Sequence, residues 1–236
     1  MSGDSPVFAA AAKLAHHGLD PAQQSQLAAV LEALASDEHA PTTVHDPQLA
    51  ADVHLADSLA ALELAAVRDA RNIADLGSGA GFPGLPLAVA LPHAHVSLIE
   101  SQRRSSEFLA RVCAAAHVEN ASPVWTRAED WNEGLSSNDL VLARALAAQP
   151  VVLEYAAPLL RRGGTLVDWR GQRLVGEEEA AERAAASLGL RRVEVLRVVP
   201  FAGARDHHLH VFVKQKDTPP GFPRRAGMAR KRPLGT

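Results

Sequence analysis

A glycine-rich segment that follows a short apolar run constrains the fold more than any other part of the chain. Residues 75–84 read D-L-G-S-G-A-G-F-P-G. Glycines at alternate positions, Gly77, Gly79 and Gly81, allow a sharp turn and a close approach of the backbone to a ligand. Doubly wound sheets bind nucleotide-like cofactors where a strand passes through such a loop into a helix. The segment therefore predicts an α/β protein with a cofactor site at this turn.

Apolar strand-like segments alternate with helical segments along most of the remaining chain. The strands are predicted at 72–76, 96–100, 122–126, 138–143, 164–169, 192–199 and 207–214. The helices between them are predicted at about 84–91, 103–117, 146–160 and 176–189. This alternation is typical of a parallel sheet with helices on both faces. The last two strands have no helix between them, so we expect an antiparallel pair at the end of a seven-stranded, Rossmann-like sheet.

Three regions are predicted around and within this sheet. Residues 1–46 form an N-terminal helical extension, with a helix at 21–35 whose apolar residues recur at helical spacing. Residues 47–216 form the α/β domain, which begins with a helix at 47–67 behind Asp46, a typical N-cap residue. Residues 217–236 contain four prolines and are predicted to form a linker-like tail.

The C-terminal end is strongly basic. From Lys214 to Thr236 there are seven cations and one anion, although the whole chain carries a net charge of −3. A basic tail on an acidic body is expected of a protein that binds a polyanion. A solvated tail without a partner is the alternative. The candidate contacts in the tail are Arg224, Arg225, Lys231 and Arg232.

Composition also argues against several classes of protein and site. Cys113 is the only cysteine, which excludes a disulfide framework and suits a reducing compartment. The apolar run at 7–12 is too short to cross a membrane. We therefore expect a cytoplasmic monomer with no membrane partner. His207, His208 and His210 lie close together, but without a neighbouring cysteine or paired carboxylate they predict no metal site.

The cofactor is the main choice that the glycine loop leaves open. Gly79, Gly81 and Gly84 also satisfy the G-x-G-x-x-G pattern of dinucleotide sites, which by itself is a weak match. Asp75 precedes the glycines, where its carboxylate can meet the cationic amino-acid part of S-adenosylmethionine but would repel a pyrophosphate. Glu100 ends the next strand and can accept both ribose hydroxyls of either cofactor. The pattern favours S-adenosylmethionine over NAD.

Motifs along most of the chain resemble those of one family, the bacterial ribosomal small-subunit methyltransferase G family, also called glucose-inhibited division protein B. The most diagnostic pair is H-L-A-D-S-L at 54–59 followed by the glycine loop. The other matching motifs are T-T-V-H-D-P at 42–47, P-G-L-P-L-A at 83–88, L-I-E-S-Q-R-R at 98–104, S-E-F-L at 106–109, R-A-E at 127–129, A-R-A at 143–145, P-L-L-R-R-G-G at 158–164 and P-R-R-A-G…K-R-P-L at 223–234.

This resemblance implies a seven-stranded methyltransferase fold and transfer of a methyl group from S-adenosylmethionine to N7 of a guanosine in the decoding region of 16S ribosomal RNA. It implies that Gly77 and Phe82 line the cofactor and that Ala128 and Glu129 flank the adenine. Arg144 is placed at the cofactor or substrate side and is our candidate catalytic residue. Basic positions that face RNA in the family correspond here to Arg103, Arg104, Arg127 and Arg170.

Two departures from the family pattern bear on RNA contact. A W-N…N-L stretch is replaced by Ala35-Ser36 and Ala40-Pro41, and the family's usual lysine before Gly171 is Arg170. Arginine still binds phosphate, with a different shape and hydration. The alternatives are a methyltransferase acting on another RNA, or an RNA-binding protein of this fold without transfer activity. We expect removal of residues 217–236 to weaken RNA binding and leave cofactor affinity nearly unchanged.

Overall fold

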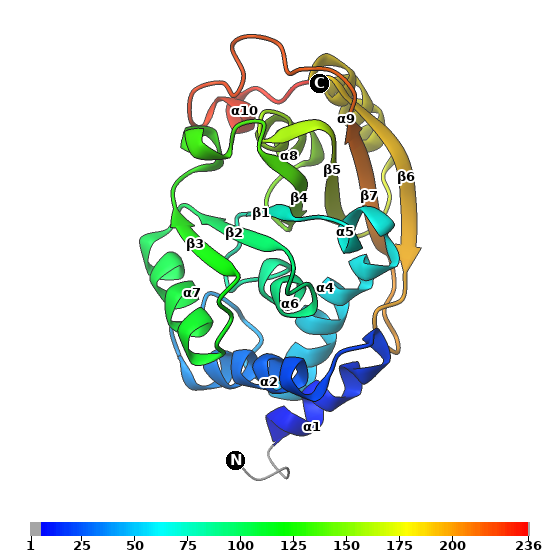
Figure 1. Ribbon diagram of the computed structural model, residues 1–236. Coiled ribbons are helices and arrows are strands. Elements are labelled where there is room, and N and C mark those ends of the chain that lie inside the picture. Colours follow the sequence, from blue (N-terminus) through cyan, green and yellow to red (C-terminus); the bar gives the residue numbers. More distant parts are fainter. Residues whose placement is uncertain (1–5, 236) are drawn as a thin grey trace.

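A seven-stranded sheet forms the centre of the protein, whose computed structural model describes residues 6–235 (Figure 1). The strand order is β3-β2-β1-β4-β5-β7-β6. Neighbours among β1 to β5 are parallel, whereas β7 is antiparallel to both β5 and β6. The strands are β1 Asn72–Leu76, β2 His95–Glu100, β3 Ala121–Trp125, β4 Asn138–Arg144, β5 Leu160–Arg170, β6 Leu190–Val198 and β7 His207–Lys214. The predicted fold class, with its antiparallel last strand, is confirmed, and β7 lies between β5 and β6.

Helices cover both faces of the sheet because buried apolar side chains point to both sides of the central strands. On β1, Ile73 packs into one apolar cluster and Ala74 into the other, and Leu140 and Val141 on β4 divide in the same way. The helices between strands are α6 Gly84–Ala90, α7 Arg103–Ala115, α8 Gln149–Ala156 and α9 Val175–Ser187, with 3-10 turns η4 Ala128–Asp130 and η5 Asn132–Gly134. The first cluster includes side chains of α6 and α7, and the second includes those of α8 and α9.

The N-terminal helices extend the layer that contains α6 and α7. They comprise α1 Pro6–Ala12, η1 Lys13–His17, α2 Pro21–Ser36, α3 Pro47–Ala50, η2 Ala51–Ala56, α4 Asp57–Leu59, η3 Ala60–Glu63 and α5 Ala65–Arg68. A capping box between Asp20 and Gln23 begins α2, which packs against α6 and α7. Within residues 6–235, no helix is both long enough and apolar enough to cross a membrane.

The single helix predicted at 47–67 is wrong in its continuity. The segment is divided into five short helical pieces, of which Ala51–Ala56 is a π-helix. Leu64 has an extended backbone that separates the last two pieces. The turns of a π-helix are wider than those of an α-helix, and they often occur at functional sites. Here the turn precedes Asp57, whose buried carboxylate contacts the ends of β4 and β7.

The C-terminal segment is packed against the body rather than extended as the linker-like tail that its prolines predicted. It contains a short helix, α10 Met228–Lys231, which contacts α8 (Figure 1). Ala229 is buried in the same apolar cluster as α8, and Phe222 and Leu234 pack against that cluster. Because apolar side chains are interspersed with the basic ones, burial offsets the loss of chain entropy and the segment is ordered.

Candidate active site

The glycine loop turns from β1 into α6 through three residues with positive φ. The angles are 69° at Gly77, 54° at Gly79 and 101° at Gly81, in a region that side chains rarely allow. The amides of Gly77 and Ser78 donate to the Ile99 carbonyl, at 2.9 and 3.1 Å, which ties the loop to the end of β2. The three predicted glycines therefore form a fixed turn at the carboxyl end of the parallel strands.

The two predicted carboxylates support this loop from behind. Asp75 is fully buried, and its Oδ2 accepts a hydrogen bond from the Gly84 amide at 3.0 Å. Glu100 accepts from the Gly79 amide through Oε2 at 3.0 Å and from the Gln102 amide through Oε1 at 2.6 Å. The Oδ1 atom of Asp75 is buried and has no hydrogen-bond partner within the described chain. An orphaned acceptor of this kind fits a cationic group or a bound water.

Burial raises the pKa of Asp75 to about 7, and the hydrogen bond from Gly84 opposes that rise. The folded carboxyl therefore keeps its proton to a higher pH than the unfolded one. Because the folded state then binds more protons between about pH 4 and about pH 7, the free energy of unfolding falls as pH rises through this window.

Replacing Asp75 by asparagine should remove this contribution, since the amide does not titrate but can still accept from Gly84. We expect the free energy of unfolding of the variant to depend less on pH, and to exceed the wild-type value near about pH 8. Urea unfolding at about pH 5 and about pH 8 measures the free energy of unfolding of both proteins. Equal pH dependence in the two proteins would contradict the raised pKa.

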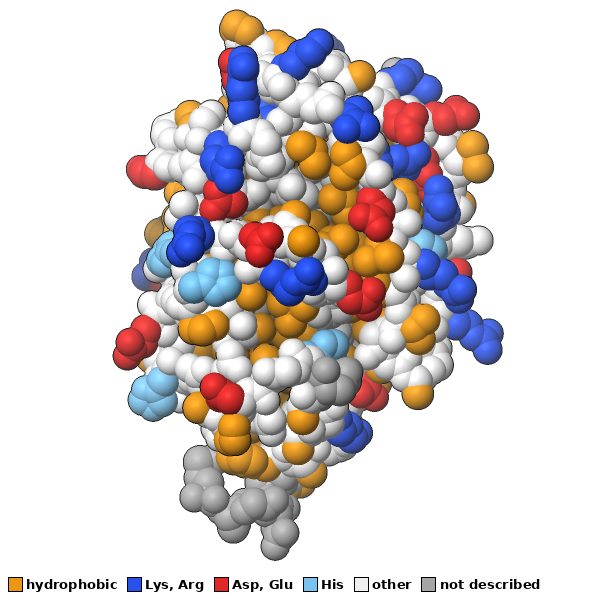
Figure 2. All heavy atoms as spheres, turned by 45° about the vertical axis from the view of Figure 1, so that its right-hand side comes forward, with side chains coloured by type: hydrophobic (Ala, Val, Ile, Leu, Met, Phe, Trp, Pro, Cys, Tyr) orange, Lys and Arg blue, Asp and Glu red, His pale blue; other side chains and the backbone are white. Residues whose placement is uncertain are grey.

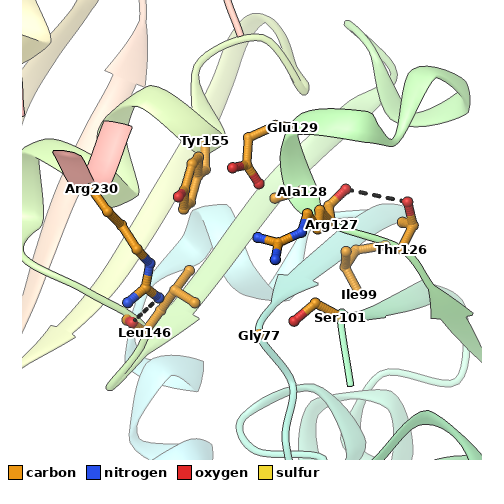
Figure 3. Close-up of a pocket in the computed structure, with 10 residues that line it drawn as sticks. All are labelled: Gly77, Ile99, Ser101, Thr126, Arg127, Ala128, Glu129, Leu146, Tyr155 and Arg230. Atoms are coloured by element: carbon orange, nitrogen blue, oxygen red, sulfur yellow. Dashed lines mark hydrogen bonds between the residues drawn. The ribbon is translucent and has the colours of Figure 1, made fainter. Parts of the chain in front are cut away.

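A first pocket opens in front of the glycine loop at the ends of β1 to β4 (Figure 3). Figure 3 shows the Arg127 side chain pointing into this pocket and Tyr155 lying between Glu129 and Arg230. Its lining residues are Gly77, Ile99, Ser101, Thr126, Arg127, Ala128, Glu129, Leu146, Tyr155 and Arg230. Gly77, Ala128 and Glu129, which the sequence assigned to the cofactor, thus share one pocket. Tyr155 and Arg230 were not predicted, because no motif connects them to the loop.

A second pocket lies on the other side of the β4 end. Its lining residues are Asp57, Arg144, Ala145, Trp169, Arg170, Gly171, Gln172, Arg205, Asp206 and His207. Ala145 separates Arg144, in this pocket, from Leu146, in the first, and it has a positive φ of 54°. Strained backbone of this kind clusters at functional sites. The two pockets therefore lie on either side of the turn that follows β4.

Arg144 is held at the second pocket by three residues of the N-terminal helical pieces. Its Nη1 donates to Asp57 Oδ2 at 2.9 Å and to the Val53 carbonyl at 3.2 Å, and its Nη2 lies 3.3 Å from His54 Nδ1. The other oxygen of Asp57 lies 2.9 Å from His207 Nδ1. His54 and Asp57, three residues apart in the chain, therefore both contact Arg144. His207 was missed as a partner, because it lies 150 residues from Asp57.

Phe82 completes this cluster from the glycine loop. Its ring stacks on that of His54, with centroids 4.6 Å apart, and the Arg144 guanidinium lies 5.6 Å from the Phe82 centroid. Burial, followed by the Arg144 charge, lowers the pKa of His54 to about 4. A neutral His54 next to Arg144 avoids the repulsion of two cations. The predicted residues Phe82 and Arg144 are therefore in contact across the site.

The predicted RNA-facing cations occupy different surroundings. Arg103 and Arg104 are exposed at the start of α7, and Arg103 pairs with Glu107 and lies over Trp125. Arg170 donates to the buried Asp168 at 2.7 Å and lines the second pocket. In Figure 2, which is turned toward the β6 edge, basic and acidic side chains are interspersed around an apolar centre. On this face the charges are of both signs, whereas three arginines, Arg144, Arg170 and Arg205, line the second pocket at the strand ends.

The tail cations divide into docked and exposed residues. Arg224 forms a two-pronged ion pair with Glu154, whose side chain is 1% exposed, so we assign Arg224 to tail docking rather than to RNA. Arg225, Lys231 and Arg232 are exposed. In the part of the chain that the structure describes, no three His, Cys, Asp or Glu side chains form a group suited to a metal ion. His207 and His208 instead contact Asp57 and the Gly171 carbonyl.

Comparison with known proteins agrees with the resemblance in the motifs. Residues 23–209 match the family described as rRNA small subunit methyltransferase G. The chain belongs to this family. A relative from Syntrophomonas wolfei, named ribosomal RNA small subunit methyltransferase G, is 39% identical over 183 residues, or 77% of this chain and 85% of that protein. A relative of the same name from Synechococcus elongatus is 34% identical over 222 residues, or 91% of each chain.

Solved structures add support for the fold of this family member. Aeropyrum pernix fibrillarin in complex with S-adenosyl-L-methionine aligns with a TM-score of 0.54 at 18% identity, covering 67% of this chain and 73% of that one. The Methanococcus jannaschii fibrillarin pre-rRNA processing protein aligns with a TM-score of 0.54 at 20% identity, covering 67% and 74%. At these identities the likeness establishes the shared sheet architecture.

Proposed function

We propose that this protein transfers a methyl group from S-adenosylmethionine to N7 of a guanosine in the decoding region of 16S ribosomal RNA. The observation that carries this proposal is the pair of pockets on either side of the β4 end. The first contains the glycine loop and the Ala128–Glu129 pair, and the second contains Arg144 and Arg170. Membership of the methyltransferase G family supports both the reaction and the RNA substrate.

The residues of the first pocket fit the cofactor. S-adenosylmethionine, when bound, supplies a methyl group on a positively charged sulfur. The fixed glycine turn leaves the backbone open to a ligand, and Asp75 and Glu100 place two carboxylates behind it. Gly77 and Phe82 line the cofactor in this proposal, and Ala128 and Glu129 flank its adenine. The positive charge of the ligand favours a site with these carboxylates.

The second pocket fits the nucleotide that accepts the methyl group. Guanine N7 has an in-plane lone pair at neutral pH, so the protein needs no general base for its attack. The protein must align the base and exclude water. Arg144, Arg170 and Arg205 line this pocket and can bind base acceptors or phosphate. Asp57 and Asp206 balance these charges and favour the positively charged ring of a 7-methylguanine product.

The RNA would approach along the arginines at the strand ends. Arg127 lines the first pocket and Arg170 lines the second, while Arg103 and Arg104 are exposed at the start of α7. Arg225, Lys231 and Arg232 are further exposed cations, on the C-terminal segment. Phosphate contacts of this kind make binding weaken as salt increases. We also expect the protein to act as a cytoplasmic monomer on 16S RNA or on the small ribosomal subunit.

Methyl transfer with labelled S-adenosylmethionine tests the proposal. We expect label in 7-methylguanosine after incubation with naked 16S RNA or with small subunits that lack the modification, followed by nucleoside analysis. Cofactor binding is measured in parallel by calorimetry. Binding of the cofactor without label in either substrate would overturn the proposed acceptor. RNA binding without cofactor binding would indicate a protein of this fold that lacks transfer activity.

A further inference from the structure

The C-terminal segment is anchored on the sheet face that carries α8. The Arg224 guanidinium pairs with the buried carboxylate of Glu154, and also donates to the Arg232 carbonyl at 2.9 Å. Arg183, on α9, donates to the Gly235 carbonyl at 2.9 Å. Ala229, in α10, is 2% exposed. These contacts hold the chain on both sides of α10 against the body of the protein. The Arg224–Glu154 pair is a strong anchor, because a buried carboxylate without its arginine would be costly.

Two hydrogen bonds then join this segment to two loops that line the first pocket. The Gly227 amide donates to Glu129 Oε1 at 3.0 Å, on the wall formed after β3. Arg230 Nη2 donates to the Leu146 carbonyl at 2.9 Å, on the wall formed after β4 (Figure 3). The segment therefore links the loops that follow β3 and β4, and Arg230 is itself one of the residues that line the pocket.

We propose that residues Gly227–Arg230 form the outer wall of the cofactor pocket and that the Arg230 guanidinium contacts the adenosine part of bound S-adenosylmethionine. The inference rests on the proposed function, which takes this cofactor as the ligand of the pocket. Arg230 shares the pocket with Ala128 and Glu129, the pair assigned to the adenine. A guanidinium can donate hydrogen bonds to the ring nitrogens of adenine or stack on its face.

Charge decides which end of the cofactor Arg230 contacts. A guanidinium close to the sulfonium would repel it, whereas adenine is neutral and rich in acceptors. The sulfonium is absent from S-adenosylhomocysteine, the demethylated product, but the adenosine is the same. Loss of Arg230 should therefore weaken the binding of both ligands by the same factor. Arg230 is exposed, and its guanidinium interacts with the Leu146 carbonyl and with the Tyr155 side chain at the edge of the pocket, so its replacement should leave the fold intact.

Calorimetric titration of the full chain with each of the two ligands tests this inference. For Arg230→Ala we expect the Kd of both ligands to rise about ten-fold, the effect of losing one hydrogen bond from a charged donor. Arg230→Lys should have an intermediate effect. The matched control is Arg191→Ala, which removes an exposed arginine from β6 at the far edge of the sheet and should bind as wild type does. Melting temperatures without ligand verify that each variant is folded.

The outcomes separate this inference from the proposed function. Wild-type-like Kd values for Arg230→Ala, with tight binding by the wild type, would overturn the role of Arg230 alone. If Arg230→Ala bound S-adenosylhomocysteine more weakly but S-adenosylmethionine more tightly than the wild type does, Arg230 would lie beside the sulfonium. That result would overturn the adenosine contact. Failure of the wild type to bind either ligand would overturn the proposed function itself. The inference also replaces our expectation that loss of residues 217–236 leaves cofactor affinity unchanged.

Discussion

Gly81→Ala is expected to abolish cofactor binding and to destabilise the protein by about 3 kcal/mol, from backbone strain together with overpacking. The φ of Gly81 is 101°, which a residue with a Cβ rarely adopts. A Cβ at this position would lie 2.8 Å from Leu85 Cγ and 3.1 Å from Leu109 Cδ2. Both leucines are fully buried, so neither can move away without disturbing the packing of α6 and α7.

Calorimetry with S-adenosylmethionine and urea unfolding measure the two effects. Gly176→Ala is the matched control, because Gly176 lies in α9, has no positive φ and would place its Cβ in open space. We expect that variant to bind the cofactor normally and to gain up to about 1 kcal/mol from helix propensity. Normal cofactor binding by Gly81→Ala would show that the loop geometry does not control the site.

Arg144→Ala is expected to eliminate methyl transfer and to destabilise the fold by about 3 to 5 kcal/mol, the cost of breaking a buried ion pair. Asp57 is 4% exposed, and without Arg144 its charge would be left with His207 as its main partner. The side chain of Arg144 is itself only 16% exposed. Loss of this cation would also remove the contacts with His54 and Phe82 that hold the glycine loop beside the second pocket.

A double-mutant cycle separates the ion pair from the rest of the site. We expect Asp57→Asn combined with Arg144→Met to be destabilised by less than the sum of the single variants, because each single change leaves one buried group unpaired. Arg103→Ala is the control, since its pair with Glu107 is exposed and should contribute less than about 1 kcal/mol. Additive effects of Asp57 and Arg144, or normal methyl transfer by Arg144→Ala, would contradict this assignment.

The sheet and the glycine loop were predictable because their signals are local. Strand segments show runs of apolar residues, and the helices between them repeat at helical spacing. Asp75 and the alternate glycines mark a strand–loop–helix unit within ten residues. The same local signals placed Glu100 at the carboxyl end of the neighbouring strand, where parallel topology brings it to the loop. Ala128 and Glu129 were assigned from the family resemblance.

The partners of these residues depend on contacts between distant parts of the chain, which no local pattern contains. His207 meets Asp57 across 150 residues, Arg224 meets Glu154 across 70, and the Gly227 amide meets Glu129 across 98. A basic, proline-rich segment has the same composition whether it is solvated or docked. Its state is decided by whether a buried carboxylate and an apolar surface face it after folding. The sequence thus predicted the glycine loop, whereas packing placed the C-terminal segment against the pocket in front of that loop.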